Sequence, residues 1–106
     1  MIVVNRFRVP PERAEQFRTD LQAARETLAA RPGHVRGRIG RNTDDPDLWV
    51  LTTEWESVGA YRRALATYDV KLTAVPVLSR ALDEPSAYEL VEPGSDLNTA
   101  SARSIG

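Results

Sequence analysis

Two side chains of unlike chemistry stand at informative places in strand-like stretches of the sequence. Asn5 lies in the middle of an alternating segment, residues 2–9, and Trp55 ends another such segment, residues 48–55. An asparagine amide offers a donor and an acceptor together, whereas a tryptophan ring offers a broad apolar face and one N–H donor. Such a pair suits a flat aromatic or quinonoid ligand.

Three further side chains can add donors or positive charge if they face the same cavity, namely Tyr61, Tyr68 and Arg80. Each candidate also has a purely structural interpretation. Trp55 can be core, Asn5 can satisfy a strand edge or a bulge, and the tyrosines can pack through their rings with hydroxyls at the surface. The residue types alone leave both interpretations open.

Other common catalytic arrangements are missing from the sequence. The chain has no cysteine and one histidine, His34, which rules out disulfides, thiolate metal ligands and a thiol nucleophile. Paired carboxylates, a Ser-His-Asp set, a glycine-rich phosphate loop and metal-ligand spacing are also lacking. Hydrolase, kinase and dinucleotide-binding functions are therefore set aside, and we expect no metal.

The charge balance argues against a nucleic-acid partner. Fourteen basic residues face fifteen acidic ones, and nine of the arginines fall within residues 1–42. These arginines are spread over a strand, a helix and another strand, and no nucleic-acid motif accompanies them. The opening residues resemble neither a signal peptide nor a membrane span. We expect a cytoplasmic protein without a nucleic-acid or membrane partner.

Hydrophobic periodicity predicts four strands and two helical regions within one domain, residues 1–92. Alternation predicts strands at 2–9, 34–41 and 48–55, and a last strand is expected at 87–92, after the turn signal of residues 83–86. A spacing of three and four residues predicts a helix from about residue 11 to 31. Ser57 is the expected N-cap of the second helical region, which is expected to break near Asp69. Five residues of this region are expected to face inward, namely Ala60, Tyr61, Ala64, Leu65 and Tyr68. A further helical stretch is interrupted or started by Pro76. We expect residues 93–106 to be a disordered tail.

The order strand, helix, strand, strand, helix, strand indicates an α+β fold, the ferredoxin-like split βαβ arrangement with an antiparallel sheet. Its helices cover one face of the sheet. The other face carries Ile2, Val4, Leu48 and Val50, an apolar patch that implies a partner. A second copy across a two-fold axis is the simplest partner, so we expect a homodimer.

Several local motifs give the chain a resemblance to the antibiotic biosynthesis monooxygenase (ABM) domain family of the dimeric α+β barrel superfamily. They are the Asn5 strand followed by residues 10–12 (Pro-Pro-Glu), residues 31–34 (Arg-Pro-Gly-His), residues 44–46 (Asp-Asp-Pro), and residues 53–57 (Thr-Glu-Trp-Glu-Ser) with Ala60, Tyr61 and Leu65. The resemblance implies a homodimeric barrel with a pocket between sheet and helices in each protomer. Some members of the family oxygenate polycyclic phenols with O₂ and neither metal nor flavin, and related members degrade haem.

The haem-degrading relatives carry an asparagine in the first strand, a tryptophan after the third, and a histidine iron ligand in the second helical region. Asn5 and Trp55 match the first two, but residues 58–85 contain no histidine. His34 precedes the second strand, where we expect it to cap or pack locally. The resemblance therefore implies catalytic roles for Asn5 and Trp55 without any cofactor.

Two functions from different classes remain open. The first is a cofactor-independent monooxygenase acting with O₂ on an aromatic or polyketide-like phenolic molecule. The second is a non-catalytic dimeric protein of the same fold that binds a small molecule or serves a stress or regulatory role. A cavity lined by Asn5 and Trp55 with room for a tricyclic ring favours the first function, and side chains filling that space favour the second.

Overall fold

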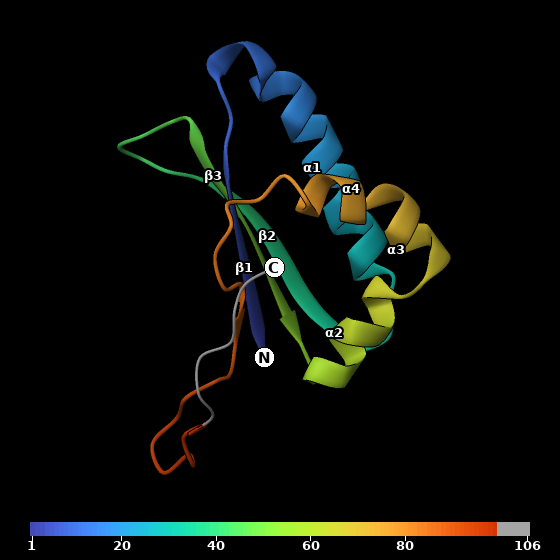
Figure 1. Ribbon diagram of the computed structural model, residues 1–106, viewed down its shortest axis with the longest axis vertical. Helices are drawn as coiled ribbons and strands as arrows, with labels where there is room; N and C mark the ends of the chain where they lie inside the picture. The colour runs from blue at the N-terminus through green and yellow to red at the C-terminus, as the bar shows by residue number, and fades with distance from the viewer. Residues whose placement is uncertain (100–106) are drawn as a thin grey trace.

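A computed structural model of the chain describes residues 1–99. Its centre is a four-stranded antiparallel sheet in the order β2-β3-β1-β4 (Figure 1). The strands are β1 (Ile2–Arg8), β2 (His34–Arg41), β3 (Leu48–Trp55) and β4 (Ala87–Tyr88). This arrangement confirms the predicted α+β class and split βαβ topology.

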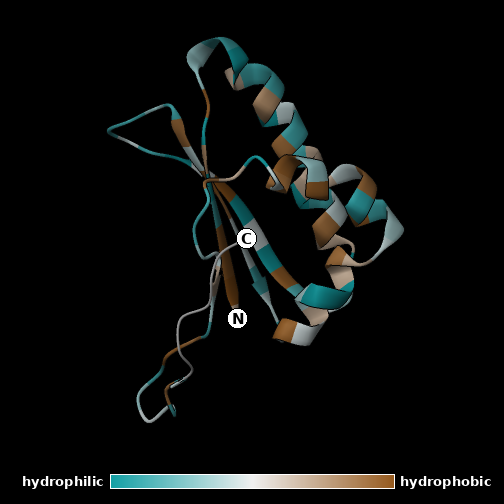
Figure 2. Ribbon diagram, viewed as in Figure 1, coloured by the Kyte–Doolittle hydropathy of each residue, from teal (hydrophilic) through white to brown (hydrophobic). Residues whose placement is uncertain are grey.

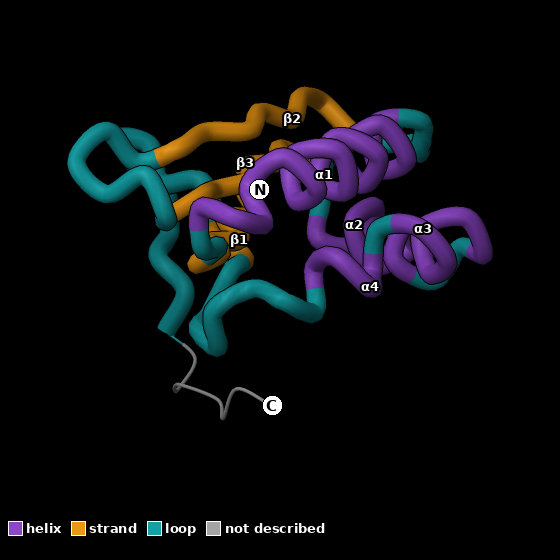
Figure 3. Tube along the Cα trace, turned by 90° about the horizontal axis from the view of Figure 1, so that it is seen from above, coloured by secondary structure: helices purple, strands orange, loops and turns teal. Residues whose placement is uncertain are grey.

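All helices lie on one side of the sheet, as the view from above shows (Figure 3). They are the 3-10 helix η1 (Pro11–Arg13), α1 (Ala14–Ala29), α2 (Val58–Leu65), α3 (Tyr68–Thr73) and α4 (Val75–Leu78). Pro11 occupies the first turn of η1, where its missing N–H costs no hydrogen bond. The predicted long helix is thus a 3-10 turn that continues into α1.

The core fills the space between the sheet and this helical layer. Along β3, residues alternate between buried and half-buried, and the buried set is Trp49, Leu51, Thr53 and Trp55. A stripe of α1 at helical spacing packs against this face and consists of Phe17, Leu21, Ala24 and Leu28. In Figure 2 the alternation of brown and teal along α1 follows from this one-sided burial.

The loop between α1 and β2 approaches the start of α2 closely. Gly33 has φ of +87°, and a Cβ placed there would lie 2.5 Å from the Cβ of Ala60. Both the positive φ and the lack of space require glycine. This contact seats α2 beside the start of β2.

The second helical region differs from the prediction in its break point. Ser57 is the N-cap of α2, as expected, and its Oγ accepts a hydrogen bond from the Ala60 N–H at 3.0 Å. However, α2 ends at Leu65, and Thr67 in extended backbone starts α3. The break therefore comes before Asp69, and it changes the phase of the helix. Tyr68 is consequently 75% exposed, and its predicted inward position is wrong.

The last strand is shorter than predicted. Residues 87–92 were expected to form it, but β4 contains only Ala87 and Tyr88, which pair with Val3 and Ile2 of β1. Residues 89–99 have no regular secondary structure, and the rest of the expected tail lies outside the described residues. Within residues 1–99 no helix has the length and apolarity needed to cross a bilayer.

Within residues 1–99, no helix covers the sheet face opposite the helical layer. Ile2, Val4, Leu48 and Val50 all lie half-buried on it. Arg6 shares this face and forms a two-bond ion pair with Glu84, at 2.7 and 2.8 Å. The face thus combines an apolar centre with a charged, internally paired group.

Candidate functional site

Asn5 and Trp55 lie on the same face of the sheet, the face that the helices cover. The pairing of β1 with β3 runs without a bulge, with Val3 opposite Thr53 and Phe7 opposite Trp49. Asn5 is opposite Leu51, four residues along β3 from Trp55. At about 3.3 Å per residue, roughly 13 Å of strand separates the two positions. They can border one site from two ends, but they do not form a contacting pair.

Three aromatic rings meet at the Trp55 end of this face. The centroid of the Trp55 ring lies 5.1 Å from that of His34, in an edge-on arrangement, and 5.5 Å from that of Tyr61. Trp55 itself is 1% exposed. The ring is therefore held between β2 and α2, and the predicted packing of His34 is confirmed.

The single donor of Trp55 already has a partner. Its indole Nε1–H donates to the Thr53 hydroxyl at 2.9 Å, within the buried core. Thr53 is the one buried polar residue of the described core, at 2% exposure. A role for the Trp55 N–H toward a ligand would require this bond to open. Thr53 was not predicted as a functional residue, although its position two residues before Trp55 on the same strand face follows from strand periodicity.

Asn5 presents an amide without a partner. Within residues 1–99 its side chain forms no hydrogen bond, and it is half-buried between Val3 and Phe7 on β1. A polar group in an apolar setting costs free energy unless it is satisfied, here by water or by a ligand. Asn5 is thus the inward-facing polar side chain most available to a bound molecule.

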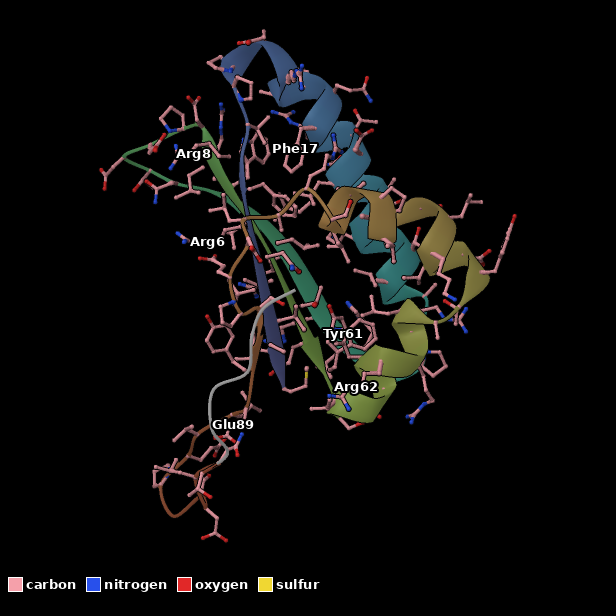
Figure 4. All side chains as sticks on the ribbon, viewed as in Figure 1. Arg6, Arg8, Phe17, Tyr61, Arg62 and Glu89 are labelled. Carbon is pink, nitrogen blue, oxygen red and sulfur yellow. The ribbon has the colours of Figure 1, made fainter. Side chains whose placement is uncertain are left out.

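Tyr61 brings a phenol to the same region from α2. Figure 4 shows its side chain directed from the helix toward the strands. Burial raises the pKa of the Tyr61 hydroxyl above its usual value of 10.0. The group therefore stays protonated at neutral pH and can donate a hydrogen bond to an oxygen of a ligand.

His34 was not predicted as a functional residue, yet it completes this cluster. Its Nε2 is buried and has no hydrogen-bond partner in the described structure. The position of a Cβ on Gly37 would be 3.3 Å from this nitrogen. Burial, together with the nearby positive charge of Arg25, lowers the pKa of His34 below 6.5. At neutral pH the imidazole is uncharged.

Arg80 and Tyr68 do not join this cluster. Arg80 lines a different cavity of about 310 Å³, located where β1 ends and α1 begins, and its Nη2 is 3.0 Å from Asp20 Oδ2. The lining of that cavity contains Phe7 but neither Asn5 nor Trp55. Tyr68 projects into solvent. Within residues 1–99 no three His, Cys, Asp or Glu side chains come together as a metal site would need.

The family model for antibiotic biosynthesis monooxygenases matches residues 1–74. The chain belongs to this family. The match covers β1, β3 and α2, and hence Asn5, Trp55 and Tyr61.

Solved structures agree with this assignment. SnoaB of Streptomyces nogalater, a cofactor-independent oxygenase, is 26% identical, with a TM-score of 0.68 over 90% of this chain and 96% of SnoaB. A candidate antibiotic biosynthesis monooxygenase of Deinococcus radiodurans, 20% identical, shares the fold with a TM-score of 0.70 over 92% of this chain and 100% of its own.

A curated relative is matched over a shorter stretch. The 42.8 kDa protein in the whiE locus of Streptomyces coelicolor is 34% identical over 47 residues, 44% of this chain. That stretch spans only 12% of the relative's length.

Proposed function

We propose that this member of the family is a cofactor-independent monooxygenase that acts with O₂ on a phenolic, aromatic or polyketide-like small molecule in the cytoplasm. The likeness to SnoaB over 90% of the chain carries the proposal. The unpaired Asn5 amide on the covered sheet face and the protonated Tyr61 hydroxyl on α2 support it.

The chemistry asked of these groups is modest. An electron-rich phenolate can transfer electrons to O₂ directly, provided that the anion forms in a site with little water. The Asn5 N–H and the Tyr61 O–H can each donate to a phenolate or peroxide oxygen. Trp55 supplies an apolar wall whose orientation is fixed by its hydrogen bond to Thr53.

The electron balance needs no added reductant for one substrate type. Where a phenolic ring system carries a CH₂ group, conversion of CH₂ to C=O releases four electrons. One O₂ accepts them, placing one oxygen atom in the product and one in water. A hydroxylated tricyclic anthrone is therefore the simplest probe.

Isotope labelling tests the proposal. The purified chain, treated with chelator and free of flavin absorbance, is incubated with a panel of hydroxylated anthrones under ¹⁸O₂. We expect products that contain one ¹⁸O atom, formed faster than in buffer alone. Rates equal to buffer across the panel would argue against the enzyme and for a binding role.

Asn5→Ala identifies the site within that assay. A lost charge-assisted hydrogen bond should lower turnover by about tenfold or more while leaving the fold unchanged. Gln22→Ala is the matched control, because Gln22 carries an exposed amide on α1. Equal turnover by both variants would place the chemistry elsewhere.

A non-catalytic small-molecule-binding function, with a stress or regulatory role, remains the second candidate. The observation favouring it is that the Trp55 N–H is already bonded to Thr53, as in a core residue. This function predicts saturable binding of the same aromatic probes without any incorporation of ¹⁸O.

A homodimer and the absence of haem complete the proposal. The half-buried apolar residues of the uncovered sheet face would be covered by a second copy.

Residues 58–85 contain no histidine that can hold haem iron. Titration with haem should therefore give no tight, stoichiometric Soret shift.

A further inference from the structure

We propose that the cavity at the junction of β1 and α1 is a second binding site, which takes a small aromatic anion such as a ring carboxylate. This inference goes beyond the proposed oxygenase function and does not depend on it. Its lining combines two phenylalanines, Phe7 and Phe17, with three arginines, Arg8, Arg13 and Arg80. Its volume of about 310 Å³ falls at the lower end of the range for small-molecule sites.

The inner wall of the cavity is apolar and rigid. Phe7 and Phe17 are 1% and 4% exposed, and their ring centroids are 5.0 Å apart. Val9 and Pro10 continue this wall toward η1. In Figure 4 Phe17 projects from α1 toward the strands at the end of the molecule that carries Arg8. Such a wall accepts the face or edge of an aromatic ring.

The rim of the cavity is cationic. It contains three arginines and no acidic residue. Arg8 and Arg80 each pair with a carboxylate outside the lining, Asp45 at 2.9 Å and Asp20 at 3.0 Å. Arg13 forms no ion pair within residues 1–99, so its charge is uncompensated. The cavity therefore attracts an anion, and Arg13 is its principal charged partner.

Arg80 is already arranged for such a ligand. Its guanidinium carbon lies 5.4 Å from the centroid of the Phe17 ring. The contact with Asp20 uses Nη2, and the guanidinium offers five N–H donors in all. Donors remain for a carboxylate whose ring rests against Phe17. An apolar wall beside a guanidinium rim selects a molecule with an aromatic body and an acidic end.

The two tryptophans provide separate reporters for the two sites. The Trp49 ring lies edge-on to Phe17 at 5.5 Å between centroids, behind the cavity wall. Its indole N–H has no hydrogen-bond partner in the described structure. Trp55, at the other end of β3, packs against His34 and Tyr61 instead. The chain contains no third tryptophan, so the two indole N–H signals report the two sites separately.

The test follows ¹⁵N-labelled full-length chain by NMR during titration with 2-naphthoate and, in parallel, with neutral 2-naphthalenemethanol. We expect saturable shifts of the Trp49 indole and of the Arg13, Gln16 and Phe17 amides, with the Trp55 indole unmoved. The neutral compound should bind about tenfold more weakly, as should Arg13→Gln with naphthoate. Arg18→Gln is the control, because Arg18 lies nearby on α1, outside the lining of the cavity, and pairs with Glu15.

Three outcomes would overturn the inference. They are no saturable shift up to millimolar naphthoate, equal binding of the neutral compound, and equal affinities of the Arg13→Gln and Arg18→Gln variants. A shift of the Trp55 indole in place of Trp49 would assign naphthoate to the inner face and would also count against this site. Since oxygen incorporation is not measured, failure here leaves the proposed oxygenase function untouched.

Discussion

Trp55 combines two properties that a single substitution can separate. Its ring packs between His34 and Tyr61, and its N–H bonds to Thr53. Trp55→Phe should keep most of the packing and cost about 0.5–1.5 kcal/mol for the lost hydrogen bond. Trp55→Ala should cost about 3–5 kcal/mol, because it leaves a cavity. Urea unfolding of the three proteins measures both values, and a loss below about 1 kcal/mol for Trp55→Ala would contradict the packing described.

His34 should make stability depend on pH in a defined interval. Its pKa in the folded chain is below 6.5, because burial and Arg25 disfavour the charged form. The unfolded chain therefore binds more protons as the pH falls below about 6.5, and the free energy of unfolding declines there. His34→Gln should flatten this decline between pH 7 and 5.5, as urea midpoints would show.

Three carboxylates titrate at lower pH than His34, so their effect on stability can be distinguished from that of His34. Hydrogen bonds lower the pKa of three carboxylates below their ordinary values, which are 3.8 for Asp and 4.5 for Glu. Asp20 accepts from Gln16 and from Arg80, Asp45 accepts from Arg8, and Glu84 accepts from Arg6. Their stabilisation is lost only as the pH falls below about 4.5. An unchanged slope above pH 5.5 in His34→Gln would show that His34 is not responsible.

At this scale the sequence allowed Asn5, Trp55 and Tyr61 to be placed on the covered face, because strand parity and helix spacing report direction. It could not reveal the Trp55 to Thr53 hydrogen bond, which depends on rotamers. Nor could it show that Arg80 lies beside Phe17, since sixty-odd residues of chain separate them and only the packing of α4 against α1 brings them together.

Among the elements, α2 depends most visibly on its N-cap, Ser57. Ser57 Oγ accepts the Ala60 N–H, and α2 has only eight residues. Ser57→Ala should destabilise the chain by about 0.5–2 kcal/mol through the loss of this cap. Ser79→Ala is the matched control, since that hydroxyl makes an exposed bond to the Pro76 carbonyl. Thermal or urea unfolding giving equal losses for both variants would argue against the cap.

Strand and helix identities followed from periodicity, and the bounds of β2 and β3 agree with the prediction. The errors fall in the second helical region and at β4. Periodicity could not distinguish one helix with a break near Asp69 from two helices that meet at Thr67, because the deciding step is a single extended residue. The turn signal of residues 83–86 indicated where β4 begins, but nothing in residues 87–92 marks its end, and only Ala87 and Tyr88 pair with β1.

For the whole molecule, the uncovered sheet face predicts the oligomeric state. Light scattering after size exclusion should give about twice the chain mass of 11.8 kDa at micromolar concentration, because an interface of standard size persists there. Val50→Glu places a charge at the centre of this face and should yield the monomer. Val58→Glu, at an exposed position on α2, should not. A parent protein of 11.8 kDa would contradict the dimer.

The central place of β1 in the sheet also affects how the chain can be made. This strand leaves the ribosome before its partners, which are residues 48–54 on one side and 87–88 on the other. Until residues 87–88 have emerged, an apolar strand has at least one open edge in the nascent chain. Such distant pairings make folding slower than local helix formation and leave this edge open to wrong partners. Chaperone contact during synthesis should therefore fall on β1.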